Sequence, residues 1–281
     1  MDMRSRIGFM QGRLSPLVDG KIQAFPKDHW REEFATAEEL NISCMEWTLD
    51  HDGLFTNPFL TKNGQAEIKE LCAKHNLSIP SLTGDFFMQA PFYKAQGLER
   101  NKLMDEMKAV LEACAILGVT YTCIPLVDAG RIENEAQEQS LLDGLEEITP
   151  FLEAQKQYIV FESDASPAEY KKFLEKLPSK TFGVNLDTGN SAAFGIDITD
   201  EITHYGERVL NVHIKDRVLG GTTLPLGTGD ATLPESVAAL EKIGYTGNYI
   251  LQTARAEDGN HAKAINTYTE MTLEWIKKSH A

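Results

Sequence analysis

The chain has 281 residues, a length at which an α/β barrel can form as one unit with a large core. Hydrophobic residues make up 42% of the chain and charged residues 25%, which is typical of an ordered globular protein and excludes a disordered chain. The formal net charge of −15 argues against binding to nucleic acids or to anionic membranes, because both require a basic surface.

Short apolar runs, rich in β-branched or aromatic residues, recur from one end of the chain to the other. Each run is typical of a buried strand in a parallel sheet. They predict eight strands, at residues 6–10, 44–48, 78–83, 121–125, 158–162, 181–186, 210–214 and 249–253.

Amphipathic segments of helical length separate these runs. They predict helices at residues 28–39, 64–75, 98–117, 138–153, 168–177, 198–207 and 233–243, with a closing helix at 262–278. Strands joined by such crossovers lie parallel, and eight of them favour a single (β/α)₈ TIM barrel domain over residues 1–281. A doubly wound open sheet is the alternative, but QGRLSP follows the first strand in place of a glycine-rich phosphate turn.

Polar side chains end four of the strands in the second half of the chain. In a barrel, the residues at the carboxyl ends of the strands build the active site. Glu162 ends YIVFE, Asp187 ends FGVNLD, His213 lies in LNVHI, and Gln252 follows YIL. An apolar approach delivers each of these side chains to a partly buried position, where a carboxylate is costly unless it is paired or binds a metal.

These four side chains predict one site for a single divalent cation. Carboxylate oxygens and an imidazole suit Mn²⁺, Mg²⁺, Co²⁺ or Zn²⁺. Gln252 is the weakest of the four candidate ligands, since a neutral amide is a poor ligand and often only a hydrogen-bonding residue. Each residue taken alone could equally be a helix cap, an ion-pair partner or a hydrogen-bonded core residue.

Charged residues near these strand ends are candidates for binding the substrate. Lys215 shares the strand face of His213 because side chains alternate, so we expect it to contact substrate oxygens. Arg217, Arg255 and Arg13 lie at loop positions where arginine can bind a phosphate or carboxylate through two hydrogen bonds, or simply face solvent.

Other features of the sequence are less specific. Gly227 and Gly229 in LPLGTGDATLPE favour a tight loop over a phosphate cradle, because they do not directly follow a strand. The four cysteines show no paired spacing and are expected to be reduced thiols. Neither a signal peptide nor a membrane span is apparent, so we expect a cytoplasmic protein.

The order of these motifs resembles the sugar phosphate isomerase/epimerase superfamily of xylose isomerase-like TIM barrels. The resemblance rests on Glu162, LDTGN, VHIKD and GTGDATLPESVAALEKIGYTGNYILQT, and it extends to RIGFMQGRLSP and CMEWTLD near the amino terminus. It implies that Glu162, Asp187, His213 and position 252 hold the metal, and that the enzyme forms dimers or tetramers. In ketose epimerases of this group, glutamates at positions 162 and 252 also act as acid and base. Gln252 departs from that pattern, which puts the two-carboxylate route in doubt.

The chemistry expected of this site is proton removal next to a carbonyl. A divalent cation bound to the substrate oxygens would stabilise the enediolate, with Glu162 as the base. Glu46, at the end of the second strand, is a candidate for the acid, although a cap or a structural ion pair is equally open.

We therefore expect an isomerase or epimerase acting on a sugar or sugar derivative, phosphorylated or free. A dehydratase or lyase of a polyol would use the same enediolate and stays an alternative, as does a barrel that binds a sugar without catalysis. A metal-dependent endonuclease on this barrel is disfavoured by the acidic charge and by the seven histidines in total.

Overall fold

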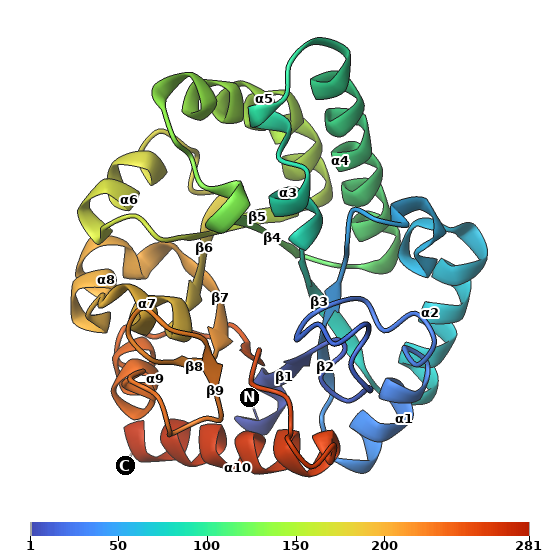
Figure 1. Ribbon diagram of the computed structural model, residues 1–281, viewed down its shortest axis with the longest axis vertical. Helices are drawn as coiled ribbons and strands as arrows, with labels where there is room; N and C mark the ends of the chain where they lie inside the picture. Colours follow the sequence, from blue (N-terminus) through green and yellow to red (C-terminus); the bar gives the residue numbers. More distant parts are fainter. Residues whose placement is uncertain (1, 281) are drawn as a thin grey trace.

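Eight parallel strands close into a barrel in the computed structural model, which describes residues 2–280 (Figure 1). Their order around the barrel is β1, β10, β7, β6, β5, β4, β3, β2. The strands are β1 (Ile7–Met10), β2 (Cys44–Thr48), β3 (Ser78–Thr83), β4 (Tyr121–Leu126), β5 (Tyr158–Ser163), β6 (Phe182–Asp187), β7 (Val209–Ile214) and β10 (Tyr249–Leu251). The predicted TIM barrel is confirmed, and every predicted strand is present with its ends within two residues.

Helices surround the barrel as an outer ring (Figure 1). They are α1 (Glu32–Glu39), α2 (Lys62–Lys74), α3 (Asp85–Gln89), α4 (Gly97–Leu117), α5 (Glu135–Gln155), α6 (Pro167–Leu174), α7 (Thr188–Phe194), α8 (Ile198–Tyr205), α9 (Leu233–Lys242) and α10 (His261–Ser279). The short helices α3 and α7 were not predicted. The prediction for the first helix was wrong at its start, because residues 28–31 form tighter turns in which the amide of His29 donates to Pro26 and that of Glu32 to His29.

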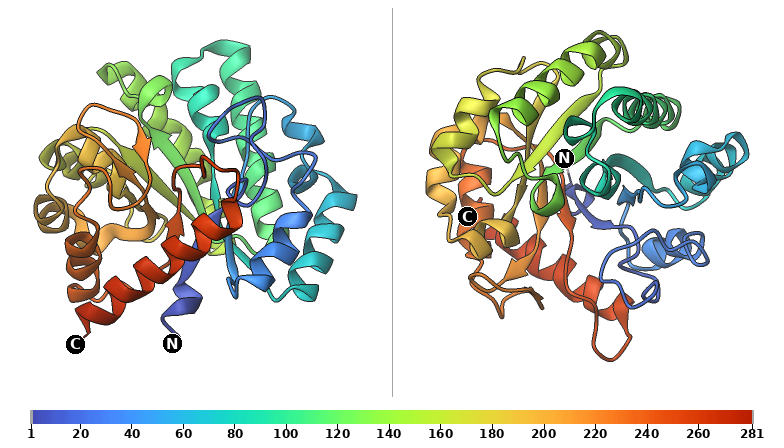
Figure 2. Two further views of the ribbon diagram at one scale, coloured as in Figure 1. Left: turned by 60° about the horizontal axis from the view of Figure 1, so that its bottom comes forward. Right: turned by 45° about the horizontal axis from the view of Figure 1, so that its top comes forward.

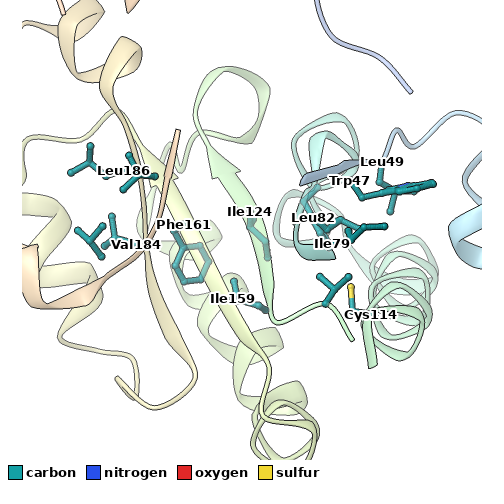
Figure 3. Packing of buried hydrophobic residues seen from close by; sticks show 14 of the residues in the cluster. Trp47, Leu49, Ile79, Leu82, Cys114, Ile124, Ile159, Phe161, Val184 and Leu186 are labelled. Atoms are coloured by element: carbon teal, nitrogen blue, oxygen red, sulfur yellow. The ribbon is translucent and has the colours of Figure 1, made fainter. Parts of the chain in front are cut away.

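The strands bury apolar side chains against the helices. Figure 3 shows part of this core, with Ile124, Phe161 and Val184 on the neighbouring strands β4, β5 and β6. The ring of Phe161 packs against that of Phe173 on α6, with ring centroids 5.4 Å apart. Because side chains alternate along a strand, Glu162 points the other way, into the barrel. The outward apolar residues thus determine which polar residues face the interior.

The two ends of the barrel differ in what they carry. The chain starts and ends at the lower end in Figure 2 (left), and the dark-blue segment that follows β1 lies at the opposite end, where the strands finish. That end also carries a small antiparallel pair, β8 (Asp216–Arg217) with β9 (Thr223–Leu224), in the connection after β7. The mouth of the barrel is therefore built from connections that follow strands.

The cysteines and the hydrophobicity of the helices can be compared with the expectations from the sequence. All four cysteines, which lie in the described part, are free thiols, as expected. Among residues 2–280, none of the helices combines the length and apolar character that crossing a bilayer requires.

Candidate active site

Glu162, Asp187 and His213 come together at the carboxyl ends of β5, β6 and β7. Each offers a ligand atom, and these atoms lie within 4.8 Å of one another. All three residues are buried, and His213 is completely inaccessible to solvent. Asp187 and His213 are direct partners in the pairing of β6 with β7. The neighbouring strands therefore place two carboxylates and an imidazole around one point.

The imidazole of His213 is held in a defined orientation by Glu46 on β2. Nε2 of His213 lies 2.7 Å from Oε1 of Glu46, and neither side chain is exposed. Nδ1 faces the opposite way, 3.4 Å from Oε2 of Glu162 and 3.8 Å from Oδ2 of Asp187. A carboxylate behind a histidine is the usual way in which a metal-binding imidazole is oriented.

Three asparagines connect these groups. Asn185 donates to Oε2 of Glu162 over 3.1 Å, and Asn190 donates to Oε1 of the same carboxylate. Asn211 donates to Oε2 of Glu46 over 2.9 Å and to Oδ1 of Asn185 over 2.9 Å. The two carboxylates are thus fixed by amides, which carry no charge that would repel a cation.

Lys215 lies between Asp187 and Gln252. Its Nζ is 3.3 Å from Oδ2 of Asp187 and 3.3 Å from Oε1 of Gln252. The stem of Lys215 passes close to Gly189 in α7, where an added Cβ would stand 2.5 Å from Cγ of the lysine, so a larger residue would displace it. The expected position of Lys215 on the face of His213 agrees with this geometry.

Electrostatic interactions favour the charged forms of Asp187, Glu46 and His213. Burial acts to raise the pKa of Asp187, but the ammonium of Lys215 and the bonds with His213 lower that pKa to about 2. Burial likewise opposes ionisation of Glu46, and His213 outweighs it, so the pKa of Glu46 lies below its ordinary value. The carboxylates around His213, Glu46 first among them, raise the pKa of the imidazole despite its burial. The site is therefore a cluster of anions that attracts positive charge.

This donor set fits a divalent cation. Two carboxylates and an imidazole nitrogen are the ligands that such ions take in proteins, and Nδ1 is turned towards the carboxylates rather than away from them. The amide oxygen of Gln252 faces Lys215, which in turn contacts Asp187. The role of Gln252 as a fourth ligand stays a prediction.

The three arginines expected to bind substrate all contact protein groups. Arg13 is 3% exposed, and its three nitrogens donate to Thr253, Ile22 and Gln23. Arg217 donates to Asn190 over 2.7 Å and to the carbonyl of Gly221, and Arg255 donates to the carbonyl of Ser15. Arg217 is thus the one of the three that contacts the cluster, through Asn190. The binding of substrate by these arginines stays a prediction.

The loop with Gly227 and Gly229 encloses a protein carboxylate. Oδ2 of Asp216 accepts hydrogen bonds from the backbone amides of residues 227, 228 and 229, and Oδ1 accepts one from Ala231. A side chain on Gly229 would collide with this carboxylate. The amides that could have cradled a phosphate are occupied, in agreement with the interpretation of a tight loop.

Several residues of the site were not predicted from the sequence. Asn190 belongs to the first turn of α7, whose cap is Asp187: Oδ1 of Asp187 accepts from the amide of Asn190 over 2.8 Å. A capping residue followed by three more residues in LDTGN is a signal that could have revealed this turn. Gln23, in the long connection after β1, and Asp85, which starts α3, also reach the mouth, and their sequence context gives no comparable signal.

Comparison with known proteins identifies the family. The model of the xylose isomerase-like TIM barrel family matches residues 34–279. The chain belongs to this family. The resemblance inferred from the motifs is therefore confirmed.

Individual relatives are distant in sequence. The chain is 21% identical over 248 residues to a putative L-ribulose-5-phosphate 3-epimerase, SgbU, of Haemophilus influenzae, covering 82% of this chain and 86% of that protein. The zinc-bound IOLI protein has a similar structure, with a TM-score of 0.75, 19% identity and coverage of 97% and 98%. So has D-psicose 3-epimerase of Clostridium cellulolyticum H10 with D-tagatose, at a TM-score of 0.73, 15% identity and coverage of 97% and 98%. These structural likenesses confirm the fold.

Proposed function

We propose that this chain is a divalent-metal-dependent isomerase or epimerase that removes a proton next to the carbonyl of a sugar. The observation that carries the proposal is the cluster of Glu162, Asp187 and His213, in which Nδ1 of the imidazole faces two carboxylates while Glu46 holds Nε2. The sugar epimerase among its relatives and the zinc bound to a similar structure support the same conclusion.

The residues of the site would have different roles in this reaction. Glu162, Asp187 and His213 would hold the cation, with Gln252 as the candidate fourth ligand. A divalent cation held there would polarise a substrate carbonyl and stabilise the negative charge that develops as the proton leaves. Glu162, supported by two asparagine amides, is placed to take the proton. The ammonium of Lys215 is placed to donate hydrogen bonds to sugar oxygens that reach the mouth.

The contacts of Glu46 favour a role other than the general acid that we expected. Its side chain is fully buried, and its two oxygens are bonded to His213 and Asn211. We propose that Glu46 positions the imidazole and does not meet the substrate. An epimerisation at this site then needs another group to deliver a proton to the opposite face of the substrate.

The first experiment tests the metal and the reaction together. Purified protein is loaded with Mn²⁺ and incubated in D₂O with D-tagatose, D-psicose or L-ribulose 5-phosphate. Deuterium at one carbon of the sugar without loss of water would support the proposal, and net dehydration would instead favour a lyase. The same preparation should bind Mn²⁺ in a 1:1 ratio, and Glu162→Ala should abolish this binding. A protein that neither binds Mn²⁺ nor exchanges any of these sugars would overturn the proposal.

A further inference from the structure

A change of configuration at a carbon next to a carbonyl requires two proton-transfer groups. One group removes the proton from one face, and another delivers a proton to the opposite face. Glu162 can serve one face, but the amide of Gln252 does not take up or release protons in this way. The second group must therefore be found elsewhere at the mouth of the barrel.

Two other carboxylates at the site, those of Glu46 and Asp187, are closed to a substrate. Both oxygens of Glu46 are bonded within the protein, and the side chain has no exposed surface. No part of the side chain of Asp187 is exposed either, whereas 8% of the side chain of Glu162 is. Neither carboxylate is placed to give a proton to a substrate.

Asp85 is placed differently. It is the first residue of α3, two positions after the end of β3, and it is half-buried. Nε2 of Gln23 donates to Oδ2 of Asp85 over 2.6 Å. No other group among residues 2–280 donates a hydrogen bond to this carboxylate. Oδ1 stays available to a ligand.

Gln23 connects Asp85 to the cluster. The amide oxygen of Gln23 accepts from Nε2 of Gln252 over 3.0 Å and from Arg13 over 3.1 Å. The amide group of Gln252 in turn contacts Lys215 through its oxygen. One continuous chain of hydrogen bonds therefore runs from Asp85 across the mouth to Lys215 and Asp187.

The surroundings of Asp85 favour a carboxyl that changes protonation near neutrality. Burial raises its pKa to about 7, with further contributions from Asp50 and Glu162. The hydrogen bond from Gln23 and the positive charge of Arg13 act in the opposite direction and are outweighed. The contribution from Glu162 also indicates that the two carboxylates lie close enough to repel each other.

We propose that Asp85 is the second proton-transfer residue, which serves the substrate face opposite to Glu162 in place of the carboxylate that position 252 lacks. This inference rests on the proposed function and narrows it to epimerisation. Glu162 takes the proton as the C–H bond of the substrate breaks, and the electron pair of that bond moves into the enediolate. The carbonyl re-forms as the carbon takes a proton from Asp85, so Glu162 ends protonated and Asp85 ionised. Exchange with solvent restores both groups.

The test compares exchange from the two epimers separately. Each member of an epimer pair that wild-type protein interconverts, with D-psicose and its C3 epimer as the first pair, is incubated in D₂O with Mn²⁺-loaded Asp85→Asn or Glu162→Gln. Asp85→Asn should lower interconversion at least 100-fold and abolish deuterium uptake from one epimer while retaining it from the other. Glu162→Gln keeps a side-chain oxygen that can hold Mn²⁺, and a preparation confirmed to contain Mn²⁺ should show the reverse pattern. A purely structural role would not produce this reciprocal asymmetry.

Other outcomes separate the two proposals. If wild-type protein exchanges neither member of any tested pair, the proposed function fails. If wild-type exchange is present and Asp85→Asn behaves like wild type, or a folded Asp85→Asn loses exchange from both epimers, the assignment of Asp85 is wrong. Asp52→Asn is the matched control, because it removes an exposed carboxylate from the connection after β2, and it should keep exchange from both epimers.

Discussion

Nε2 of His213 lies 2.7 Å from Oε1 of Glu46, and both side chains are closed to solvent. The contact joins β2 to β7, and its two residues are 167 positions apart in the chain. It turns Nδ1 towards Glu162 and Asp187, so the proposed metal site depends on a carboxylate that is not one of its ligands.

Glu46→Gln should weaken Mn²⁺ binding roughly 10- to 100-fold, the usual cost of losing the group that orients a metal-binding histidine. The amide preserves the shape of the side chain but removes the charge that favours the donor form of Nε2. Isothermal titration with Mn²⁺ measures the effect. Glu33→Gln is the matched control, since Glu33 is also buried but binds the amides of Gly12 and Leu14. Equal affinities for wild type and Glu46→Gln would show that His213 is oriented without Glu46.

Lys215→Met should affect the metal and the substrate in opposite directions. Loss of the ammonium removes a positive charge 3.3 Å from Asp187, so Mn²⁺ should bind more tightly. Loss of a charged hydrogen-bond donor costs about 1.5–3 kcal/mol, so kcat/KM for the sugar should fall roughly 10- to 150-fold. Lys215→Arg keeps the charge and should leave the metal affinity near that of wild type. Unchanged kcat/KM in Lys215→Met would restrict the lysine to holding Asp187.

Protein stability should decline as the pH rises from about 5 to 8, partly because of Glu201. Burial, with Asp187 and Asp200 nearby, raises the pKa of this carboxyl from 4.5 to about 7. The folded state therefore binds its proton more tightly than the unfolded state, and the stability present below pH 4.5 is lost as the pH rises through 7, by about 3 kcal/mol. Urea unfolding at several pH values should show a smaller decline for Glu201→Gln. The exposed Glu207→Gln should follow wild type, and identical slopes for all three proteins would refute this origin.

Asp216→Ala should destabilise the connection between β8 and α9. Four backbone amides lose their acceptor, which we expect to cost at least about 2 kcal/mol, since hydrogen bonds to a charged group are worth about 1.5–3 kcal/mol. Thermal unfolding and proteolysis between residues 218 and 231 measure the change. Asp230→Asn is a milder control, because Asp230 accepts one amide bond, from Leu219. A melting temperature that does not move in Asp216→Ala would show that the loop is held by other contacts.

The sequence was most informative where a polar residue ends an apolar run. Glu162, Asp187 and His213 could be found because the apolar residues before them commit each strand to the core, and a period of two then determines which side chains face inward. The same alternation predicted that Lys215 shares the strand face of His213. The closed barrel brings these strand ends together, as the predicted fold implied.

Residues in irregular segments could not be placed from sequence. Asp85 follows Gly84 in a five-residue helix, and Gln23 lies in a connection with no periodic pattern, so neither has a face that can be deduced. The partner of Glu46 was equally hidden, because a contact between residues far apart in the chain depends on the register of the whole barrel. Strand patterns identify the cluster but not the groups that orient it.

The bridge made by Gln23 has a consequence for selectivity. A ligand that enters between Asp85 and Gln252 must substitute for an amide that donates on one side and accepts on the other. A hydroxyl group does both, and a polyhydroxylated compound can satisfy each exposed partner in turn. A deoxygenated analogue would leave a polar partner unsatisfied, and such sites discriminate strongly against ligands that lack a single hydroxyl.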